Sequence, residues 1–191
     1  MSTHKSQSIS LLIDLIQKES VTPDDNGCQQ LIAKRLEKLD FEIESMPSGD
    51  VSNLWARRGS EAPLLVFAGH TDVVPTGDIN AWSSPPFSAH IVDDHIIGRG
   101  AADMKGGLAA MVTAVERFIA SSGHEKGSIA FLITSEEKGP AVEGTRFVVD
   151  QLQQREEAID FCIVGEPTSS SELGDTIRHG RRGSLGASLA I

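Results

Sequence analysis

Three hydrophobic segments of the chain each lead into side chains that can bind a metal ion or transfer a proton. In chain order these are His70 and Asp72 after residues 64–68, Glu136 and Glu137 after residues 129–133, and Glu166 after residues 159–164. A further carboxylate, Asp103, follows a glycine-rich stretch at residues 98–102. Imidazole together with carboxylates is a donor set that suits zinc, with one coordination position left for water. The residue types therefore point to a metal-dependent hydrolytic site.

The spacing of these groups indicates how such a site would work. A divalent metal lowers the pKa of a bound water toward neutrality and so supplies a nucleophile. A carboxylate that is not itself a ligand can take up and return the proton. His70 and Asp72 are two residues apart, so in an extended segment they point the same way. We therefore expect Asp72 to accept a hydrogen bond from the ring nitrogen of His70 that faces away from the metal.

Each of these residues also has an ordinary interpretation. A histidine two residues before an aspartate is common, and Asp103 fits the N-cap of the helix that follows it. Glu136 and Glu137 fit the solvated start of a loop. The combination favours a site, because every group stands at the end of a predicted strand or at the start of a predicted helix.

The segments that would position these residues alternate between helix-like and strand-like patterns. Apolar residues three and four apart predict helices over residues 9–16, 28–39, 108–119 and 147–152. Short apolar runs predict strands at 41–44, 54–56, 64–68, 129–133 and 159–164, the last three buried, with a hairpin at 91–97. Strands alternating with helices imply an α/β fold with a mostly parallel sheet. In such sheets ligands bind beyond the carboxyl ends of the strands, where the polar residues above would converge.

Composition restricts the class of partner. The chain of 191 residues has 17 Lys plus Arg and 27 Asp plus Glu, a formal net charge of −10, so it lacks the basic field that attracts nucleic acid. No apolar run approaches the ~20 residues that span a membrane, and the first residues do not resemble a signal peptide. Cys28 and Cys162 have no metal-binding or redox spacing and are interpreted as reduced core thiols. We expect a cytoplasmic protein with neither nucleic-acid nor membrane partners.

The last part of the sequence differs in character. Residues 168–171 form a polar segment, and residues 184–191 have the pattern of a single strand. Because a lone strand has no sheet of its own to join, we expect the sequence to stop inside a second domain. The predicted organisation is part of a catalytic domain over residues 1–176 and an incomplete second domain over residues 177–191.

Three motifs resemble those of a known family, the co-catalytic zinc peptidases and deacylases that include aminoacylase and acetylornithine deacetylase. They are Gly-His-Thr-Asp-Val-Val-Pro at residues 69–75, Gly-Arg-Gly-Ala-Ala-Asp-Met-Lys-Gly-Gly at residues 98–107, and Val-Gly-Glu-Pro at residues 164–167. The first two are highly specific in combination, and the similarity covers nearly the whole chain. The resemblance implies a three-layer catalytic domain with a mixed sheet between helices. It also implies an α+β lid and dimerisation domain, begun by residues 177–191, and a homodimer for a full-length member.

The resemblance implies individual roles for the site residues. His70 and Glu166 would hold one zinc ion, Asp103 would bridge two zinc ions, and Asp72 would orient His70. The peptide bond between Asp103 and Met104 would be cis. Cobalt is expected to be able to replace zinc.

The glutamates near residue 136 depart from the family pattern. The family has Ser-Asp-Glu-Glu-Gly where this sequence has Ser-Glu-Glu-Lys-Gly at residues 135–139. Without a gap, Glu137 is the general base and Lys138 replaces a glutamate that binds the second zinc; a slip of one residue would make Glu136 the base and Glu137 the ligand. We favour the ungapped register because the flanking residues keep their spacing. A histidine ligand of the second zinc would lie beyond Ile191, so we expect one complete zinc site.

Further features are similar to the branch of the family that removes succinyl groups from a diamino acid. They are Ser-Val-Thr-Pro at residues 20–23, Trp82 with Pro-Pro-Phe at residues 85–87, and Gly-Arg-Arg-Gly-Ser at residues 180–184. The small-molecule substrate of that branch carries several carboxylates, one of which Arg181 would bind through paired hydrogen bonds. Two alternatives stay open: an acetylornithine-type deacylase, and a shortened member that folds without turnover. The chain by itself is expected to have very low activity.

Overall fold

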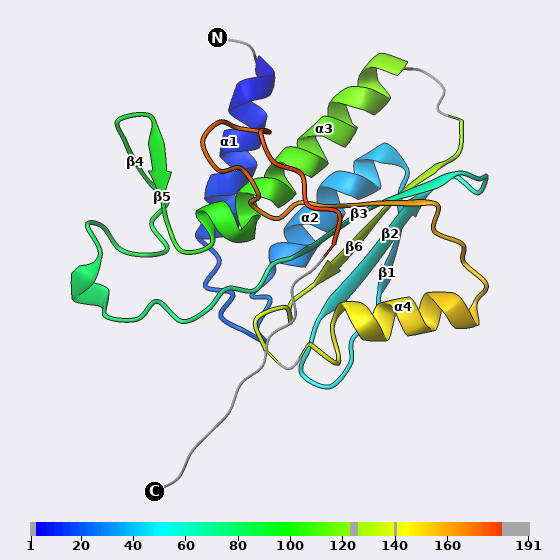
Figure 1. The fold of residues 1–191 in the computed structure, drawn as a ribbon, viewed down its shortest axis with the longest axis horizontal. Coiled ribbons are helices and arrows are strands. Elements are labelled where there is room, and N and C mark those ends of the chain that lie inside the picture. Colours follow the sequence, from blue (N-terminus) through cyan, green and yellow to red (C-terminus); the bar gives the residue numbers. More distant parts are fainter. Residues whose placement is uncertain (1–2, 123–125, 140, 181–191) are drawn as a thin grey trace, which may run out of the picture.

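A five-stranded mixed sheet forms the centre of the computed structural model, which describes residues 3–122, 126–139 and 141–180 (Figure 1). Across the sheet the strands are β1 (Glu42–Ser45), β2 (Asn53–Arg58), β6 (Ser128–Thr134), β3 (Leu64–His70) and β7 (Phe161–Val164). Strand β2 is antiparallel to both of its neighbours, whereas β6, β3 and β7 are parallel to one another. The predicted α/β fold with a mostly parallel mixed sheet is therefore confirmed.

Helices cover both faces of this sheet and make the three layers expected. Helices α1 (Thr3–Ile16), α2 (Cys28–Leu36) and α3 (Gly106–Ser122) lie on one face, and α4 (Thr145–Gln154) lies on the other (Figure 1). Each interface has its own hydrophobic core. The larger core joins the first three helices to side chains such as Phe131 and Ile133 of β6. The smaller core packs Val148 and Leu152 of α4 against Leu132.

The three parallel strands end at the same edge of the sheet. All residues of β6 are buried, as expected for a central strand whose sequence is continuously apolar. His70 is paired in register with Thr134, and Ala68 with Val164. The segments that follow β3, β6 and β7 therefore emerge close together, which brings the predicted site residues to one place.

The remaining elements are short. Strands β4 (His90–Val92) and β5 (His95–Ile97) form the predicted hairpin, turning at Asp93 and Asp94, which both have positive φ. The predicted helix 28–39 ends earlier than expected, because α2 stops at Leu36 and a 3₁₀ turn, η1 (Glu37–Leu39), continues it. The loops also contain η2 (Ile79–Ala81) and a kinked segment, η3 (Ala101–Lys105).

The prediction that residues 159–164 form a buried strand is wrong. Strand β7 begins at Phe161 and is exposed along its length, with Phe161 61% and Ile163 49% exposed. The reason is its place in the sheet, since β7 pairs with β3 on one side and lies at the margin of the described strands. Cys162 is consequently exposed and is not a core thiol, whereas Cys28 is buried as predicted.

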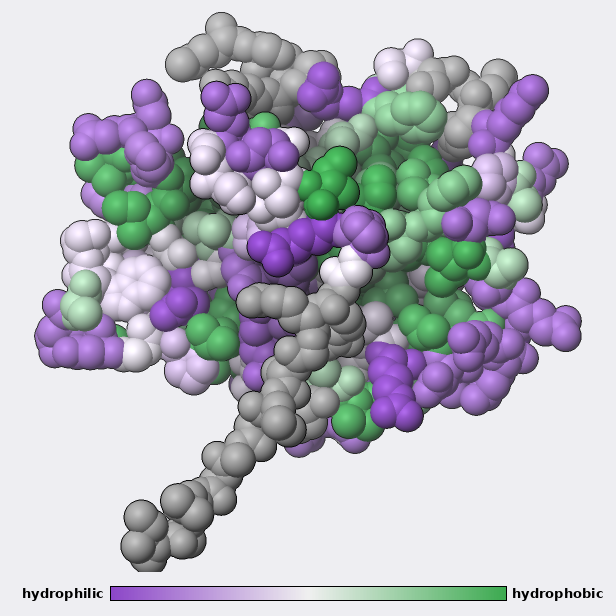
Figure 2. Space-filling model, viewed as in Figure 1, coloured by the Kyte–Doolittle hydropathy of each residue, from purple (hydrophilic) through white to green (hydrophobic). Residues whose placement is uncertain are grey.

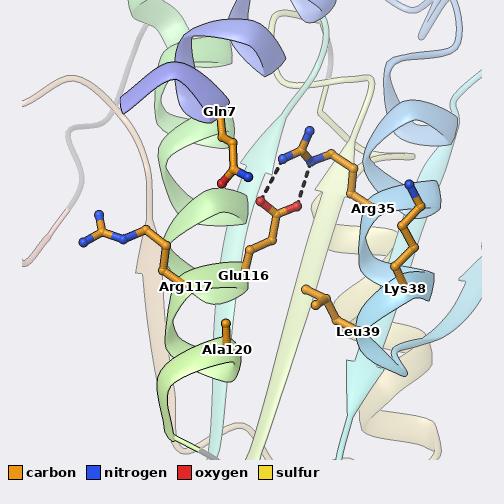
Figure 3. Close-up of a pocket in the computed structure, with 7 residues that line it drawn as sticks. All are labelled: Gln7, Arg35, Lys38, Leu39, Glu116, Arg117 and Ala120. Carbon is orange, nitrogen blue, oxygen red and sulfur yellow. Dashed lines mark hydrogen bonds and ion pairs between the residues drawn. The ribbon is translucent and has the colours of Figure 1, made fainter. Parts of the chain in front are cut away.

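An ion pair joins two of the helices on the larger layer. In Figure 3, Arg35 of α2 reaches Glu116 of α3 through two parallel hydrogen bonds of 2.8 and 2.7 Å. Arg35, Glu116 and the side chain of Gln7 from α1 line a shared surface groove. This bidentate ion pair links α2 to α3.

The predicted strand at 184–191 lies outside the described residues. None of the helices within the described ranges is long and apolar enough to cross a membrane.

Candidate metal centre

Three predicted ligands converge at the carboxyl edge of the sheet. The Nε2 atom of His70 lies 3.1 Å from Oδ1 of Asp103 and 3.3 Å from Oε1 of Glu166. Among the described residues, these three side chains form a group whose donor atoms all lie within 4.8 Å of one another. The imidazole is 1% exposed, whereas the carboxylates of Asp103 and Glu166 remain open to solvent at 47% and 33%. The group is therefore anchored on its protein side and accessible from outside.

Each of the three residues is placed by a different part of the chain. His70 is the last residue of β3, and Glu166 stands two residues after β7, which is parallel to β3. Asp103 lies in η3, where its φ of −121° and ψ of 98° are non-helical and break the path into α3. The peptide bond between Asp103 and Met104 is cis, as predicted.

Two glycines permit this close arrangement of backbone. Gly100, before η3, has a φ of 81°, and a β-carbon there would lie 2.5 Å from Cγ1 of Val73. Gly107, in the first turn of α3, would collide through a β-carbon with the carbonyl oxygen of Gly165. A side chain at Gly107 would push α3 away from Gly165, which precedes Glu166, and a side chain at Gly100 would be strained by the positive φ and would crowd Val73.

The far side of the imidazole is held by residue 72. Nδ1 of His70 lies 2.8 Å from the backbone carbonyl oxygen of Asp72, and 3.5 Å from its carboxylate. Because a carbonyl only accepts hydrogen bonds, Nδ1 carries the proton and donates it, which turns the lone pair of Nε2 toward Asp103 and Glu166. In the neutral imidazole, three acceptor atoms then face one another with no donor between them. A cation among them would remove this repulsion, so the donor set fits a metal ion.

The carboxylate of Asp72 has a different set of partners from the one expected. It accepts hydrogen bonds from the hydroxyl of Thr22 at 2.5 Å and from the backbone N–H groups of Glu137 and Lys138 at 3.1 and 3.2 Å. Asp72 is fully buried, so these donors compensate the cost of burying its charge. The residue thus ties the imidazole, through its backbone, to the loop that carries Glu137.

The two neighbouring glutamates point to different places. Glu137 is 48% exposed, and its Oε2 lies 2.9 Å from Nζ of Lys138. The same ammonium lies 3.0 Å from Oδ2 of Asp103, so Glu137 is connected to the three-residue group through Lys138. Glu136 is buried, and its Oε2 accepts a hydrogen bond from the backbone N–H of Glu143 at 2.9 Å. Its carboxylate serves the backbone of the next loop.

These contacts shift the pKa values of three groups. Burial alone would lower the pKa of His70, but the contacts with Glu166 and Asp72 outweigh it and leave the pKa raised. Burial would raise the pKa of Asp103, and the hydrogen bond from Lys138 outweighs it, so that pKa is lowered. Burial would likewise lower the pKa of Lys138, but its contacts with Glu137 and Asp103 raise it. The site is therefore an electrostatically coupled group of an imidazole, carboxylates and one ammonium.

Three of these contacts were not predicted from the sequence, and one predicted site residue is not described. The role of Thr22 as a donor to Asp72 was not predicted, although it belongs to the Ser-Val-Thr-Pro motif at residues 20–23. The ion pairs of Lys138 with Asp103 and Glu137 were not predicted either. Arg181, the predicted substrate-binding residue, lies outside the described residues.

Comparison with known families gives one match that covers more than half of the chain. The model of peptidase family M20/M25/M40 matches residues 66–180. That range contains all three residues of the candidate metal centre.

Curated relatives match over nearly the whole chain. Succinyl-diaminopimelate desuccinylases from Acinetobacter baumannii, Psychromonas ingrahamii and Hahella chejuensis are 58%, 57% and 54% identical, over 97%, 96% and 100% of this chain. The matches cover 49%, 48% and 50% of those relatives, so the chain spans about half of their length.

Solved structures share the fold. Human carnosine dipeptidase 1 superposes with a TM-score of 0.74 at 23% identity, over 87% of this chain and 39% of the other. An M20 family metallo-carboxypeptidase from Sulfolobus solfataricus gives 0.69 at 23% identity, over 88% and 38%. These likenesses support the architecture of the sheet and its helices.

Proposed function

The chain belongs to peptidase family M20/M25/M40, and on that premise we propose that its site hydrolyses an amide bond with one zinc ion held by His70, Asp103 and Glu166. One observation carries this proposal, namely the convergence of three acceptor atoms within 4.8 Å at the carboxyl edge of the sheet. One imidazole and two carboxylates, with an open side, are the donor set of a catalytic zinc site. The catalytic domain is proposed to extend over residues 1–176.

The neighbouring residues have defined tasks in this proposal. Zinc, when bound, polarises the substrate carbonyl and makes water a nucleophile at neutral pH. Glu137 is the general base: its exposed carboxylate takes a proton from water and gives it to the departing amine. Asp72 keeps His70 in the tautomer that turns Nε2 toward the open side. The ungapped register is favoured because Glu136 is buried and bound to the backbone of Glu143.

We propose a succinylated diamino acid, N-succinyl-LL-2,6-diaminopimelate, as the substrate. Support comes from the curated desuccinylases, which are 54–58% identical over nearly the whole chain. Because the chain spans about half of their length, residues outside it can contribute to binding in those relatives. The carboxylates of such a substrate suit recognition by an arginine, and Arg181 is proposed for that role.

The test is a hydrolysis assay with two substrates. The zinc-loaded chain is assayed alone, and also joined to the part of the Acinetobacter baumannii relative that its match leaves uncovered. Release of succinate from N-succinyl-diaminopimelate and of acetate from N-acetylornithine is followed by chromatography. The matched control is the same pair of proteins with His70→Ala, which removes the buried ligand.

We expect succinate to be released faster than acetate, and we expect His70→Ala to abolish the release. Faster release of acetate would replace the proposed substrate by the acetylornithine alternative. Zinc bound without turnover in either protein would instead favour the catalytically silent member.

A further inference from the structure

Lys138 occupies an unusual position beside the candidate metal centre. Its ammonium lies between two carboxylates, 3.0 Å from Oδ2 of Asp103 and 2.9 Å from Oε2 of Glu137. Asp103 therefore has one oxygen directed at His70 and the other directed at an ammonium. One oxygen of Asp103 thus faces the candidate metal position beside His70, and the other oxygen faces the ammonium of Lys138.

The lysine is anchored at both ends. Its backbone N–H donates to Oδ2 of Asp72 at 3.2 Å, and its side chain is 20% exposed. Moving the ammonium into solvent would break both of its ion pairs. The side chain is therefore part of the site, in contrast to a lysine that extends into water.

The charges of the site balance with this lysine and a single divalent ion. Asp103, Glu166 and Glu137 together contribute three negative charges, while Asp72 is compensated by the hydrogen bonds of Thr22 and two backbone N–H groups. One divalent ion and one ammonium supply three positive charges. A second divalent ion beyond Asp103 would meet the ammonium at close range, where like charges repel strongly in a partly buried site.

We infer that the ammonium of Lys138 is a built-in monovalent cation on the far side of Asp103, so that the site takes one divalent metal ion and not two. Lys138 is a positioning residue in this arrangement, because it holds Oδ2 of Asp103 and the carboxylate of Glu137 without being a ligand of the metal. This inference deepens the proposed function and rests on the three-ligand group described there.

Zinc stoichiometry tests the inference without recourse to activity. The chain, joined as in the hydrolysis assay to the part of the Acinetobacter baumannii relative that its match leaves uncovered, is equilibrated with excess zinc, dialysed, and analysed by elemental analysis and native mass spectrometry. The unsubstituted chain is expected to retain one zinc ion. Lys138→Glu, which replaces the ammonium by a third carboxylate beside Asp103 and Glu137, is expected to retain two. Lys138→Met removes the charge without adding a ligand and is expected to retain one.

The experiment has a matched control and three outcomes that would contradict the inference. Arg155→Met removes a basic residue that is also paired with a carboxylate, Glu44, but outside the site, and is expected to retain one zinc ion. Circular dichroism checks that each variant is folded. Two zinc ions in the unsubstituted chain, or one in folded Lys138→Glu, would overturn the inference while leaving the proposed function intact. No zinc in the unsubstituted chain would overturn both.

Discussion

One carboxylate oxygen of Asp103 lies next to the imidazole of His70, and the other lies next to the ammonium of Lys138. Substitutions on the two sides of Asp103 are therefore expected to have different effects. His70 is buried and oriented by a backbone carbonyl, so its position depends little on side-chain freedom. Glu137 is half-exposed, so its position depends on the lysine beside it. The candidate ligand His70 is therefore held rigidly, whereas the proposed base Glu137 has more freedom to move.

Glutamine at position 137 tests the assignment of the general base. Glu137→Gln in the joined protein is expected to lower the rate of hydrolysis by about 10²–10⁴-fold, because proton transfer is lost, while zinc stays bound. Glu136→Gln is the matched control and should keep most of the rate, since its carboxylate serves the backbone of Glu143. Steady-state rates and zinc content decide between them; a loss of rate confined to Glu136→Gln would favour the slipped register.

Asparagine at position 72 tests the link between His70 and the loop of Glu137. In Asp72→Asn an N–H₂ donor replaces one of the two oxygens that accept hydrogen bonds from the backbone N–H groups of Glu137 and Lys138, so at least one of these bonds is lost, at a cost of about 1–3 kcal/mol. We expect zinc affinity to fall about 10–100-fold, as for other residues that support a ligand. Competition with a chromophoric chelator measures the affinity. Unchanged affinity would show that the backbone carbonyl alone orients the imidazole.

At the scale of elements, the loop before α3 is held by a buried lysine. The ammonium of Lys105 donates to the carbonyl oxygens of Leu15 and Lys18, each at 2.8 Å, at the end of α1. Lys105 follows Asp103 by two residues, so this contact ties the end of α1 to the segment that carries a candidate ligand. Burial lowers the pKa of Lys105, and the nearby Cys28 and Asp25 oppose that effect.

Methionine at position 105 would remove both hydrogen bonds and keep the volume of the side chain. Lys105→Met leaves two carbonyl oxygens without this donor, and about 1–3 kcal/mol is lost for a buried group that stays unsatisfied. We expect the free energy of unfolding to fall by at least that amount in urea titrations. Lys38→Met, an exposed lysine of η1, is the control and should change stability by less than about 0.5 kcal/mol. Equal stabilities of the two variants would contradict the role given to Lys105.

The two thiols report on the exposed position of β7. Burial raises the pKa of Cys28 to about 11, so its thiol stays protonated and unreactive at pH 8, and its contribution to stability is lost only as pH rises from 9 toward 11. Cys162 is exposed. A thiol reagent such as DTNB should therefore modify one cysteine in the native chain and two in denaturant, and none in native Cys162→Ser. Two rapidly reacting thiols in the native chain would contradict the burial of Cys28.

At the scale of the whole molecule, apolar surface gathers between α3 and β7. A groove of about 700 Å³ is lined mainly by apolar side chains, including Phe67, Phe118, Phe161 and Ile163. Phe118 and Phe161 are 45% and 61% exposed. Green, hydrophobic surface is visible over α3 and the neighbouring strands in Figure 2. Contiguous exposed apolar surface of this kind binds apolar molecules from solution.

A fluorescent apolar dye provides the test. The chain is expected to enhance the fluorescence of ANS in its native state, and Phe161→Asp should remove most of the enhancement because it places a charge in the groove. Leu173→Asp is the control, since Leu173 is fully exposed and does not line the groove. Equal loss of fluorescence in both variants would show that the dye does not bind there.

The sequence by itself indicated the candidate residues of the site and the type of the main helices and strands. His70, Asp103 and Glu166 could be named because each follows a segment whose periodicity identifies a strand or precedes one that identifies a helix. Such patterns depend on residues close together in the chain, and parallel strands bring their carboxyl ends to one edge whatever their order.

Only the tertiary structure decided the contacts between distant segments. Strand β7 has an apolar sequence like that of β6, yet β6 is central and β7 lies at the margin, because strand order depends on pairing across the sheet. The ammonium of Lys138 contacts Asp103, 35 residues earlier in the chain, because the fold brings the loop after β6 next to η3. Periodicity records which face of an element is buried but not which element lies opposite, so these partners could not be read from the sequence.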